Sequence, residues 1–268
     1  MQTFKTIQNL QVALHRWQDK GDKIAFVPTM GGLHRGHLSL VDLAKKKADR
    51  VVVSIFVNPT QFAAHEDFGT YPRTIESDLA LLKAQAVDCV FIPDAAMIYP
   101  NGMQQDIDVG EVGQILCGKT RPHFFNGVLQ VVRHLFDIVR PDVAVFGQKD
   151  YQQLHIIQHF TSGVEIIEAP IVREQDGLAM STRNQYLSKD ERKLAPELYK
   201  TLVKIEKGLL DQQSAVQQLQ NYFKLDYLEI LDANTLKQTT GNTRKIAILC
   251  AVFLGATRLI DNIISSKA

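Results

Sequence analysis

Two histidines, His34 and His37, follow a pair of glycines in the segment 28–37, which comes directly after the apolar run 24–27. This order predicts a strand, a glycine turn and a helix. Glycines let a phosphate approach the backbone, and a helix N-terminus offers unpaired N–H groups and a positive dipole end. Because residues three apart share a helix face, both histidines can donate hydrogen bonds to one phosphate. The pattern indicates an α-phosphate site that stabilises charge during adenylyl transfer, against the simpler interpretation of two capping histidines.

Amides follow the next apolar run. Asn58 and Gln61 lie after residues 51–57, and Pro59 ends the strand there. Their side chains carry both donors and acceptors, which suits a small polar substrate. A polar strand-to-loop turn is the alternative interpretation.

Two further motifs each contain a cationic side chain. Lys149, Asp150 and Gln153 follow the apolar run 143–147. Lys149 can reach phosphates, Asp150 can accept from ribose hydroxyls and Gln153 can reach a substrate, unless the first two form a surface pair and a helix cap. The run Ser181-Thr182-Arg183 is a candidate phosphate clamp, because arginine binds phosphate through two parallel hydrogen bonds. A polar interdomain linker is its alternative.

Metal ligands are less clearly marked. ATP chemistry needs Mg²⁺, which binds through one or two carboxylates plus phosphates, and Asp78 or Asp67 are the candidates. His155 and His159 have the i,i+4 spacing of a metal pair, but no third ligand is evident in the sequence.

The elements that must position these residues alternate along the chain. Apolar runs predict strands at 23–28, 51–57, 89–93, 143–147 and 164–169, and helical patterns occupy 7–21, 38–49, 74–86, 127–139 and 151–160. This alternation predicts an α/β fold with a Rossmann-like, doubly wound parallel sheet. Ligands of such sheets bind beyond the carboxyl ends of the strands, which is where the polar motifs lie.

The pattern changes after residue 173. Helical segments at 189–209 and 215–223 precede strand-like segments at 227–231, 245–253 and 257–261. We therefore predict two domains, residues 1–173 with the sheet and residues 174–268 as a smaller α+β domain.

Composition excludes several classes of protein. The net charge of +1 gives no bulk attraction to nucleic acid or a membrane surface. Cys89 and Cys250 lie in apolar runs, and the absence of a CxxC pair argues against zinc and for a reducing compartment. The N-terminal residues lack the apolar core of a signal peptide, and no membrane-length apolar run occurs, so a cytoplasmic protein is expected.

Taken together, the motifs HxGH (34–37), NPxQF (58–62), GxKDxQQ (147–153) and SxRN (181–184) resemble the pantothenate synthetase (pantoate–β-alanine ligase) family. The similarity covers essentially the whole chain and includes YPRT (71–74), YLEI (227–230) and TRLIDN (257–262). HxGH alone would indicate only the wider adenylyl-transferring superfamily. The resemblance implies that the smaller domain is a lid and that the enzyme is a homodimer.

The resemblance also implies a reaction and roles for matching residues. Pantoate would attack the α-phosphate of ATP to give pantoyl adenylate, and β-alanine would then displace AMP. His34, His37, Lys149 and Arg183 would be catalytic, Gln61 and Gln153 would hold pantoate, Gln61 would also meet β-alanine, and Asp78 would lie near the Mg²⁺-bound phosphates. The nucleotide contacts would be Met30, Gly31, Gly32, Leu33, His34, Arg35, Gly36, His37, Gly147, Gln148, Lys149, Asp150, Val172, Met180, Ser181, Thr182 and Arg183.

The chain departs from the family pattern at a few positions. Gly32 replaces the usual alanine, and Thr182 replaces a serine while keeping the hydroxyl. The family commonly reads Arg-Pro-Gly-His-Phe where this chain has His123 and Phe124 at the third and fourth positions. A compensating role for His123 is a hypothesis that unchanged half-reactions in His123→Ala would refute.

Two other functions compete. One is a different HxGH enzyme that transfers a nucleotidyl group to a phosphorylated metabolite, which the substrate amides argue against. The other is a non-catalytic nucleotide-binding module, which would not need Lys149 and Arg183 together. Dinucleotide binding is disfavoured because no GxGxxG follows the first strand.

Overall fold

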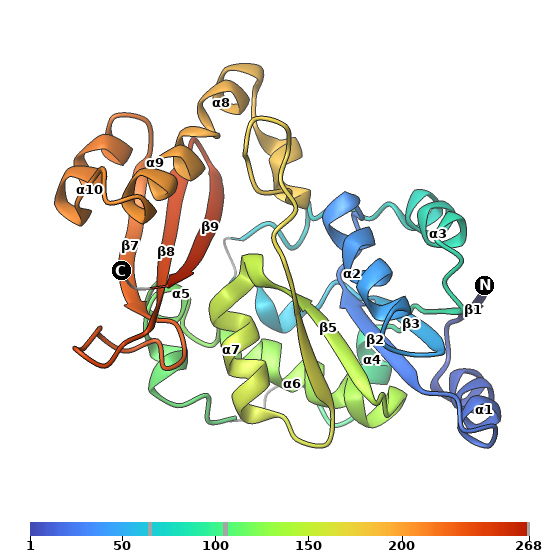
Figure 1. Cartoon of the computed structure of the whole chain (residues 1–268). Helices are drawn as coiled ribbons and strands as arrows, with labels where there is room; N and C mark the ends of the chain where they lie inside the picture. The colour runs from blue at the N-terminus through green and yellow to red at the C-terminus, as the bar shows by residue number, and fades with distance from the viewer. Residues whose placement is uncertain (64–65, 104–106, 267–268) are drawn as a thin grey trace. The chain divides into compact units, whose positions relative to one another are not determined.

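The computed structural model describes residues 1–63, 66–103 and 107–266 (Figure 1). Contacts divide the chain into two compact units. The first consists of Met1–Gly147 and Gln153–Pro170, and the second of Gln148–Gln152 and Ile171–Ala268. Each unit is described by itself below. The assignment of 148–152 to the second unit has no counterpart in the sequence pattern, and the predicted boundary at residue 173 stays a prediction.

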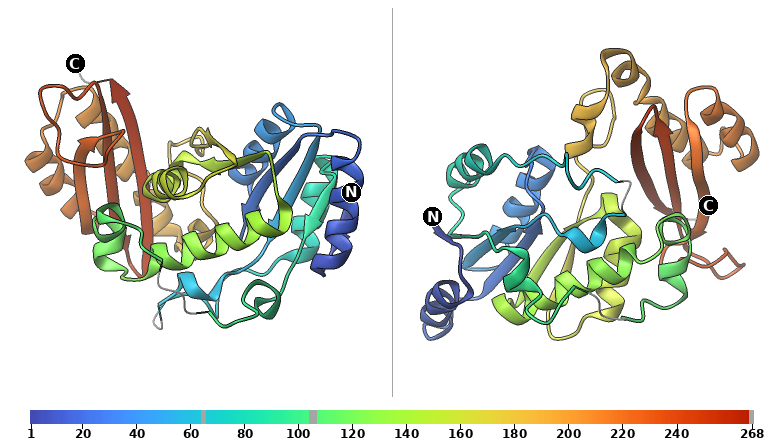
Figure 2. Two further views of the ribbon diagram at one scale, coloured as in Figure 1. Left: turned by 90° about the horizontal axis from the view of Figure 1, so that it is seen from below. Right: turned by 180° about the vertical axis from the view of Figure 1, so that it is seen from behind.

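The first unit is built on a six-stranded sheet whose paired strands are all parallel (Figures 1 and 2). Across the sheet the strands are β1 (Gln2–Phe4), β4 (Cys89–Phe91), β3 (Arg50–Ile55), β2 (Ile24–Thr29), β5 (Val143–Gly147) and β6 (Glu165–Ala169). The predicted doubly wound parallel sheet is confirmed. The short edge strand β1 was not predicted, because three residues are too few to show a period.

The strand order creates one topological switch point. From β2 the chain proceeds through β3 to β4 on one side, and then returns to pair β5 on the other side of β2. The connections after β2 and β5 therefore leave the sheet in opposite directions. Ligands of open α/β sheets bind beyond the carboxyl ends of the strands at such a point.

Helices cover both faces of this sheet. Alternate strand residues such as Ala25 and Val53 pack with α2 (Arg35–Lys45) and α3 (Ile75–Ala84). Phe26 points to the other face, where its ring meets Phe136 of α6 (Phe124–Val139) edge to face, with centroids 6.3 Å apart. The remaining helices are α1 (Ile7–Gln18), α4 (Ala95–Ile98), α5 (Cys117–Thr120), α7 (Tyr151–Phe160), which begins in the second unit, and the 3₁₀ helices η1 (Pro59–Gln61) and η2 (Glu111–Gln114).

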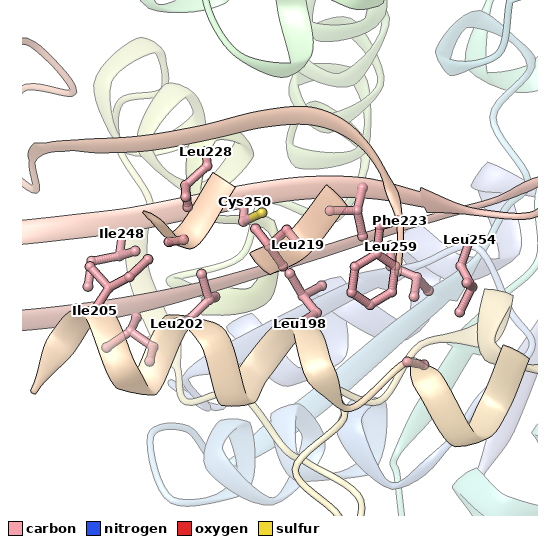
Figure 3. Packing of buried hydrophobic residues seen from close by; sticks show 14 of the residues in the cluster. Leu198, Leu202, Ile205, Leu219, Phe223, Leu228, Ile248, Cys250, Leu254 and Leu259 are labelled. Atoms are coloured by element: carbon pink, nitrogen blue, oxygen red, sulfur yellow. The ribbon is translucent and has the colours of Figure 1, made fainter. Parts of the chain in front are cut away.

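The second unit has a three-stranded antiparallel sheet packed against helices. Its strands are β7 (Lys224–Asp232), β8 (Lys245–Leu254) and β9 (Thr257–Ser266), and its helices are η3 (Gln148–Asp150), η4 (Thr182–Tyr186), α8 (Lys189–Leu194), α9 (Glu197–Glu206) and α10 (Gln212–Gln220). Figure 3 shows Leu198 and Leu202 of α9 against Ile248 and Cys250 of β8. This apolar layer gives the smaller unit a core of its own.

Several predicted element boundaries were wrong in this unit, including the starts of α10 and β7. The helix predicted at 189–209 is two helices, because Pro196 has no N–H and cannot continue the hydrogen-bond ladder. Strand β9 runs to Ser266 rather than to residue 261.

The predicted burial of Cys89 and Cys250 is confirmed, and burial raises the pKa of the Cys89 thiol to about 12.

Candidate functional site

The turn after β2 depends on two glycines with left-handed backbone angles. Gly31 has φ +82° and Gly32 has φ +62°, a region that residues with a Cβ rarely adopt. A Cβ on Gly31 would also lie 3.0 Å from both a carboxylate oxygen of Asp78 and a methyl group of Ile55. Space and backbone angle therefore both require glycine at Gly31.

The carboxylate of Asp78 holds this turn in place. It is 1% exposed, and its oxygens accept hydrogen bonds from the Gly32 N–H at 3.0 Å and the Leu33 N–H at 2.9 Å. The Thr74 hydroxyl donates to the same carboxylate at 3.2 Å. A buried carboxylate with its oxygens directed at backbone amides does not fit a direct metal ligand.

The two histidines are oriented by the start of α2. The helix begins at Arg35, earlier than predicted, so His34 is its N-cap and His37 lies in its first turn. The Gly36 N–H donates to Nδ1 of His34 at 3.1 Å, and the His34 N–H donates to Nδ1 of His37 at 3.3 Å. In each neutral ring the hydrogen must therefore reside on Nε2. The ring centroids lie 4.1 Å apart, so the two imidazole rings lie side by side at a helix N-terminus.

The amide of Asn58 is engaged by the protein rather than left for a ligand. Its Nδ2 donates to the Gly127 carbonyl at 3.1 Å, and its Oδ1 accepts from the Tyr99 hydroxyl at 2.6 Å. Asn58 is 1% exposed. Burial raises the pKa of Tyr99 to about 12, which keeps this hydroxyl protonated as a donor. We therefore assign Asn58 to anchoring η1, which corrects the expectation that its amide holds a substrate.

The two predicted substrate glutamines lie on elements that follow strands of the first unit. Gln61 ends η1 after β3, and Gln153 lies in the first turn of α7 after β5. Both are half-buried. Gly147, the last residue of β5, lies against α2, since a Cβ there would be 3.9 Å from Leu40. The glycine turn, η1 and β5 are thus parts of one carboxyl edge, as predicted for the first unit.

The departure at His123 carries a backbone cost. His123 is exposed, has φ +71° and ψ −8°, and makes no side-chain capping hydrogen bond to α6 among the described residues. A left-handed angle is costly for any residue with a Cβ. Phe124 lies beneath the Arg121 guanidinium, 3.7 Å from ring centroid to Cζ.

We expect His123→Gly to stabilise the protein by about 1 kcal/mol, because glycine adopts this backbone angle without strain. Thermal unfolding followed by circular dichroism checks the prediction. His15→Gly, at an exposed position within α1, is the matched control and should shift stability in the opposite direction. A lower melting temperature for His123→Gly would contradict the strain argument.

In the second unit, the segment that carries Lys149 is held by Asn262 of β9. The Asn262 Nδ2 donates to the carbonyls of Gln148 at 2.9 Å and Lys149 at 3.0 Å. Its Oδ1 accepts from the Gln148 side chain at 3.1 Å. The Lys149 ammonium lies 4.0 Å from a carboxylate oxygen of Asp150. The TRLIDN motif therefore contributes the anchor of the lysine, a role that its sequence pattern does not indicate.

The remaining predicted nucleotide residues lie in one hairpin-like segment of the same unit. The Met180 N–H donates to the Val172 carbonyl at 2.9 Å. Ser181 caps η4, and its hydroxyl accepts from the Arg183 N–H at 3.3 Å. Thr182 and Arg183 form the first turn of η4. These contacts define the backbone of the proposed phosphate clamp.

A buried ion pair ties this segment to β9. Arg173 donates to both carboxylate oxygens of Asp261, at 2.6 and 2.9 Å, and its guanidinium lies 3.6 Å from the centroid of the Tyr199 ring. The Asp261 side chain is 1% exposed. The sequence showed no signal for this pairing across 88 residues.

Arg173→Leu should lower the free energy of unfolding by about 3–5 kcal/mol, because it leaves the Asp261 carboxylate buried without its cation. Denaturation by urea measures the loss. The double variant Arg173→Leu/Asp261→Leu removes both charges and should recover a large part of it. Equal losses in the single and double variants would contradict the buried-charge explanation.

The histidine pair on α7 gains no support as a metal site. The rings of His155 and His159 are parallel with centroids 6.5 Å apart. Burial lowers the pKa of His155, and the electrostatic effect of the neighbouring His159 lowers it further. Within the described part of the chain they belong to no group of three possible metal ligands.

Comparisons with known proteins identify relatives over nearly the whole chain. The family model described as pantoate-beta-alanine ligase matches residues 2–264. The chain is 58% identical over 273 residues to a pantothenate synthetase of Ruthia magnifica subsp. Calyptogena magnifica, covering 97% of this chain and 98% of the relative. It is 46% identical to the pantothenate synthetase of Ectopseudomonas mendocina, and this match covers 100% of this chain and 99% of the relative.

Solved structures show the same similarity. A pantothenate synthetase from Thermus thermophilus superposes with a TM-score of 0.91 at 40% identity, covering 98% of this chain and 99% of that chain. A pantoate-beta-alanine ligase from Francisella tularensis, complexed with beta-gamma ATP and beta-alanine, gives a TM-score of 0.84 at 34% identity. The match covers 98% of this chain and 97% of that chain.

Proposed function

The chain belongs to the pantoate–β-alanine ligase family, and on that premise we propose what each part of the site does. The enzyme condenses pantoate with β-alanine, with ATP as the activating substrate. A pantoate carboxylate oxygen attacks the α-phosphorus and pyrophosphate leaves. The β-alanine amine then attacks the acyl carbon, and AMP leaves to give pantothenate. Adenylation is needed because a carboxylate is a poor acceptor for an amine at neutral pH.

The observation that carries the adenylation step is the pair of Nε2–H donors at the start of α2. His34 and His37 have their Nδ1 atoms occupied by backbone N–H groups, so each neutral ring carries its hydrogen on Nε2, and we propose that both Nε2–H groups donate to the α-phosphate. Negative charge builds on the α-phosphate during attack. Donors that are already oriented stabilise that charge without reorganising. The backbone from Met30 to His37 lines the phosphates in this proposal.

Gln61 and Gln153 are proposed to bind pantoate in the first unit, and Gln61 also meets β-alanine. Each amide offers both a donor and an acceptor, which matches the carboxylate and hydroxyl groups of a hydroxy acid. Gly147, with no side chain at the edge of β5, leaves room for the nucleotide. Asn58 holds η1 and so supports Gln61 without binding the substrate.

From the second unit we propose Lys149 and Arg183 as the cations that bind the phosphates. Asp150 accepts from the ribose hydroxyls, and the backbone around Gln148, Val172 and Met180 contacts the nucleotide. Ser181 and Thr182 supply hydroxyl donors to phosphate oxygens. Arginine suits a phosphate because its planar donors match two oxygens at once.

ATP is proposed to bind as its Mg²⁺ complex, with the phosphates rather than Asp78 as the principal ligands, because the Asp78 oxygens face the glycine turn. We also propose a homodimer on the basis of the family resemblance. No described helix is long and apolar enough to cross a bilayer. The three reduced cysteines lead us to propose a cytoplasmic location.

Exchange of labelled pyrophosphate into ATP tests the proposal. Exchange that requires pantoate and proceeds without β-alanine is expected, since the adenylate forms reversibly before the amine is needed. Addition of β-alanine should then release AMP and pantothenate. Exchange that is independent of pantoate, or its absence from folded enzyme that binds ATP, would contradict the proposed acceptor.

A further inference from the structure

Arg121 forms a close, two-point ion pair with Glu66 in the first unit. Nε donates to Oε1 at 2.6 Å, and Nη2 donates to Oε2 at 2.7 Å. The two side chains are only 16% and 18% exposed. A parallel, largely shielded pair of this kind fixes the plane of the guanidinium as well as its position.

The same guanidinium has two further contacts. Nη2 also donates to the backbone carbonyl of Gln61 at 3.0 Å. The face of the Phe124 ring lies 3.7 Å from Cζ, which is within the range of a cation–π interaction. Glu66 therefore holds one edge of the Arg121 guanidinium, and Phe124 covers one of its faces. One Nη2 donor is directed at the carbonyl of Gln61, the last residue of η1.

The opposite end of η1 is anchored separately. Asn58 caps this 3₁₀ helix and is itself fixed by Tyr99 and by the Gly127 carbonyl. With Asn58 at one end and Arg121 at the other, the backbone that carries the Gln61 side chain is constrained on both sides. The positions of reacting groups must be held to within a fraction of an ångström for efficient chemistry.

We propose that Arg121, held by Glu66 and Phe124, is a positioning residue that places the Gln61 side chain for binding of pantoate. The proposal rests on the role of Gln61 in the proposed function. Glu66 neutralises the guanidinium and occupies two of its donors, so Arg121 acts through Gln61 rather than on the substrate carboxylate. Phe124 supports this arrangement where a smaller side chain would leave the guanidinium face uncovered.

Steady-state kinetics of four variants test this assignment. Arg121→Ala should lower kcat/KM for pantoate by about 10- to 100-fold while the KM for ATP stays within about twofold, because only the end of η1 is released. Glu66→Gln and Phe124→Leu each remove one support and should cause smaller changes of the same kind. Arg133→Ala is the matched control, since this exposed arginine donates to a backbone carbonyl, that of Phe160, elsewhere in the unit.

Glu66→Gln separates positioning from direct binding. If Arg121 positions Gln61, this variant weakens the use of pantoate. If Arg121 instead binds the substrate carboxylate, freeing it from Glu66 should lower the KM for pantoate, which would overturn the proposal. Unchanged pantoate kinetics in both Arg121→Ala and Glu66→Gln would overturn it as well.

A double-mutant cycle gives a second criterion. In a Gln61→Ala background, adding Arg121→Ala should cause no further loss of activity if the arginine acts through that side chain. Fully multiplicative losses would contradict the proposal. Arg121→Lys, which keeps the charge but not the fork, replaces the alanine variant if that variant does not fold. Pantoate-dependent exchange in the unmodified enzyme establishes the proposed function independently of these outcomes.

Discussion

Replacing His37 with alanine is expected to slow adenylate formation by roughly 10²–10⁴-fold, which is the range for losing one oriented donor or proton-transfer group. The His37 ring lies beside that of His34, with centroids 4.1 Å apart, and the hydrogen bonds to both Nδ1 atoms hold the rings in place before the reaction begins. Pyrophosphate exchange in the presence of pantoate measures this step alone. Turnover near that of the unmodified enzyme would exclude the proposed role.

A second substitution separates catalysis from helix capping at the same position. His37 accepts the His34 N–H through Nδ1, and the side-chain oxygen of asparagine can occupy a similar place. His37→Asn should therefore retain the melting temperature yet remain as inactive as His37→Ala, because it has no donor where Nε2 lies. His159→Ala, at an exposed histidine of α7, is the control that should remain fully active.

Asp78→Asn is expected to lower kcat/KM for ATP by about 100-fold and the free energy of unfolding by about 1–3 kcal/mol. The two oxygens of Asp78 accept from two backbone N–H groups, those of Gly32 and Leu33. An asparagine offers one oxygen only, so its NH₂ group must face one of these donors. The glycine turn would then shift away from the phosphates. ATP-dependent kinetics and urea denaturation measure the two effects.

Asp142→Asn is a matched control for this prediction. Its carboxylate accepts the Ile24 N–H at 2.7 Å at the amino end of β2, and a single acceptor is still available after the change to asparagine. Catalysis should be unaffected there. If Asp78→Asn is poorly folded, Thr74→Val removes the hydroxyl that supports the carboxylate and provides a milder test. Unaltered ATP kinetics in a folded Asp78→Asn enzyme would show that the turn does not depend on this carboxylate.

Much of the fold was predictable because its determinants are local. Buried parallel strands appear as uninterrupted apolar runs, and helices repeat their apolar residues every three or four positions, so the doubly wound sheet followed from the pattern alone. The misplaced elements had weak local signals. Three residues define β1, and the apolar pattern continued across Pro196 although the helix did not.

The candidate site likewise contains residues that local sequence could identify and a residue, Asn58, whose role it could not. The glycines, the paired histidines and the amides could be identified because turns and helix starts depend on residues adjacent in sequence. Asn58 was misassigned because whether an amide is available depends on Tyr99 and Gly127, which are 41 and 69 residues away. Periodicity carries no information about such partners.

The sequence by itself determined the family resemblance, the parallel sheet and which motifs follow the carboxyl ends of its strands. Only the tertiary structure decided which polar groups serve the protein itself. Asp78 shapes the glycine turn, Asn262 holds the Lys149 backbone and Arg121 is fixed by Glu66. The physical reason is that a hydrogen bond acts over about 3 Å in space, whatever the separation along the chain.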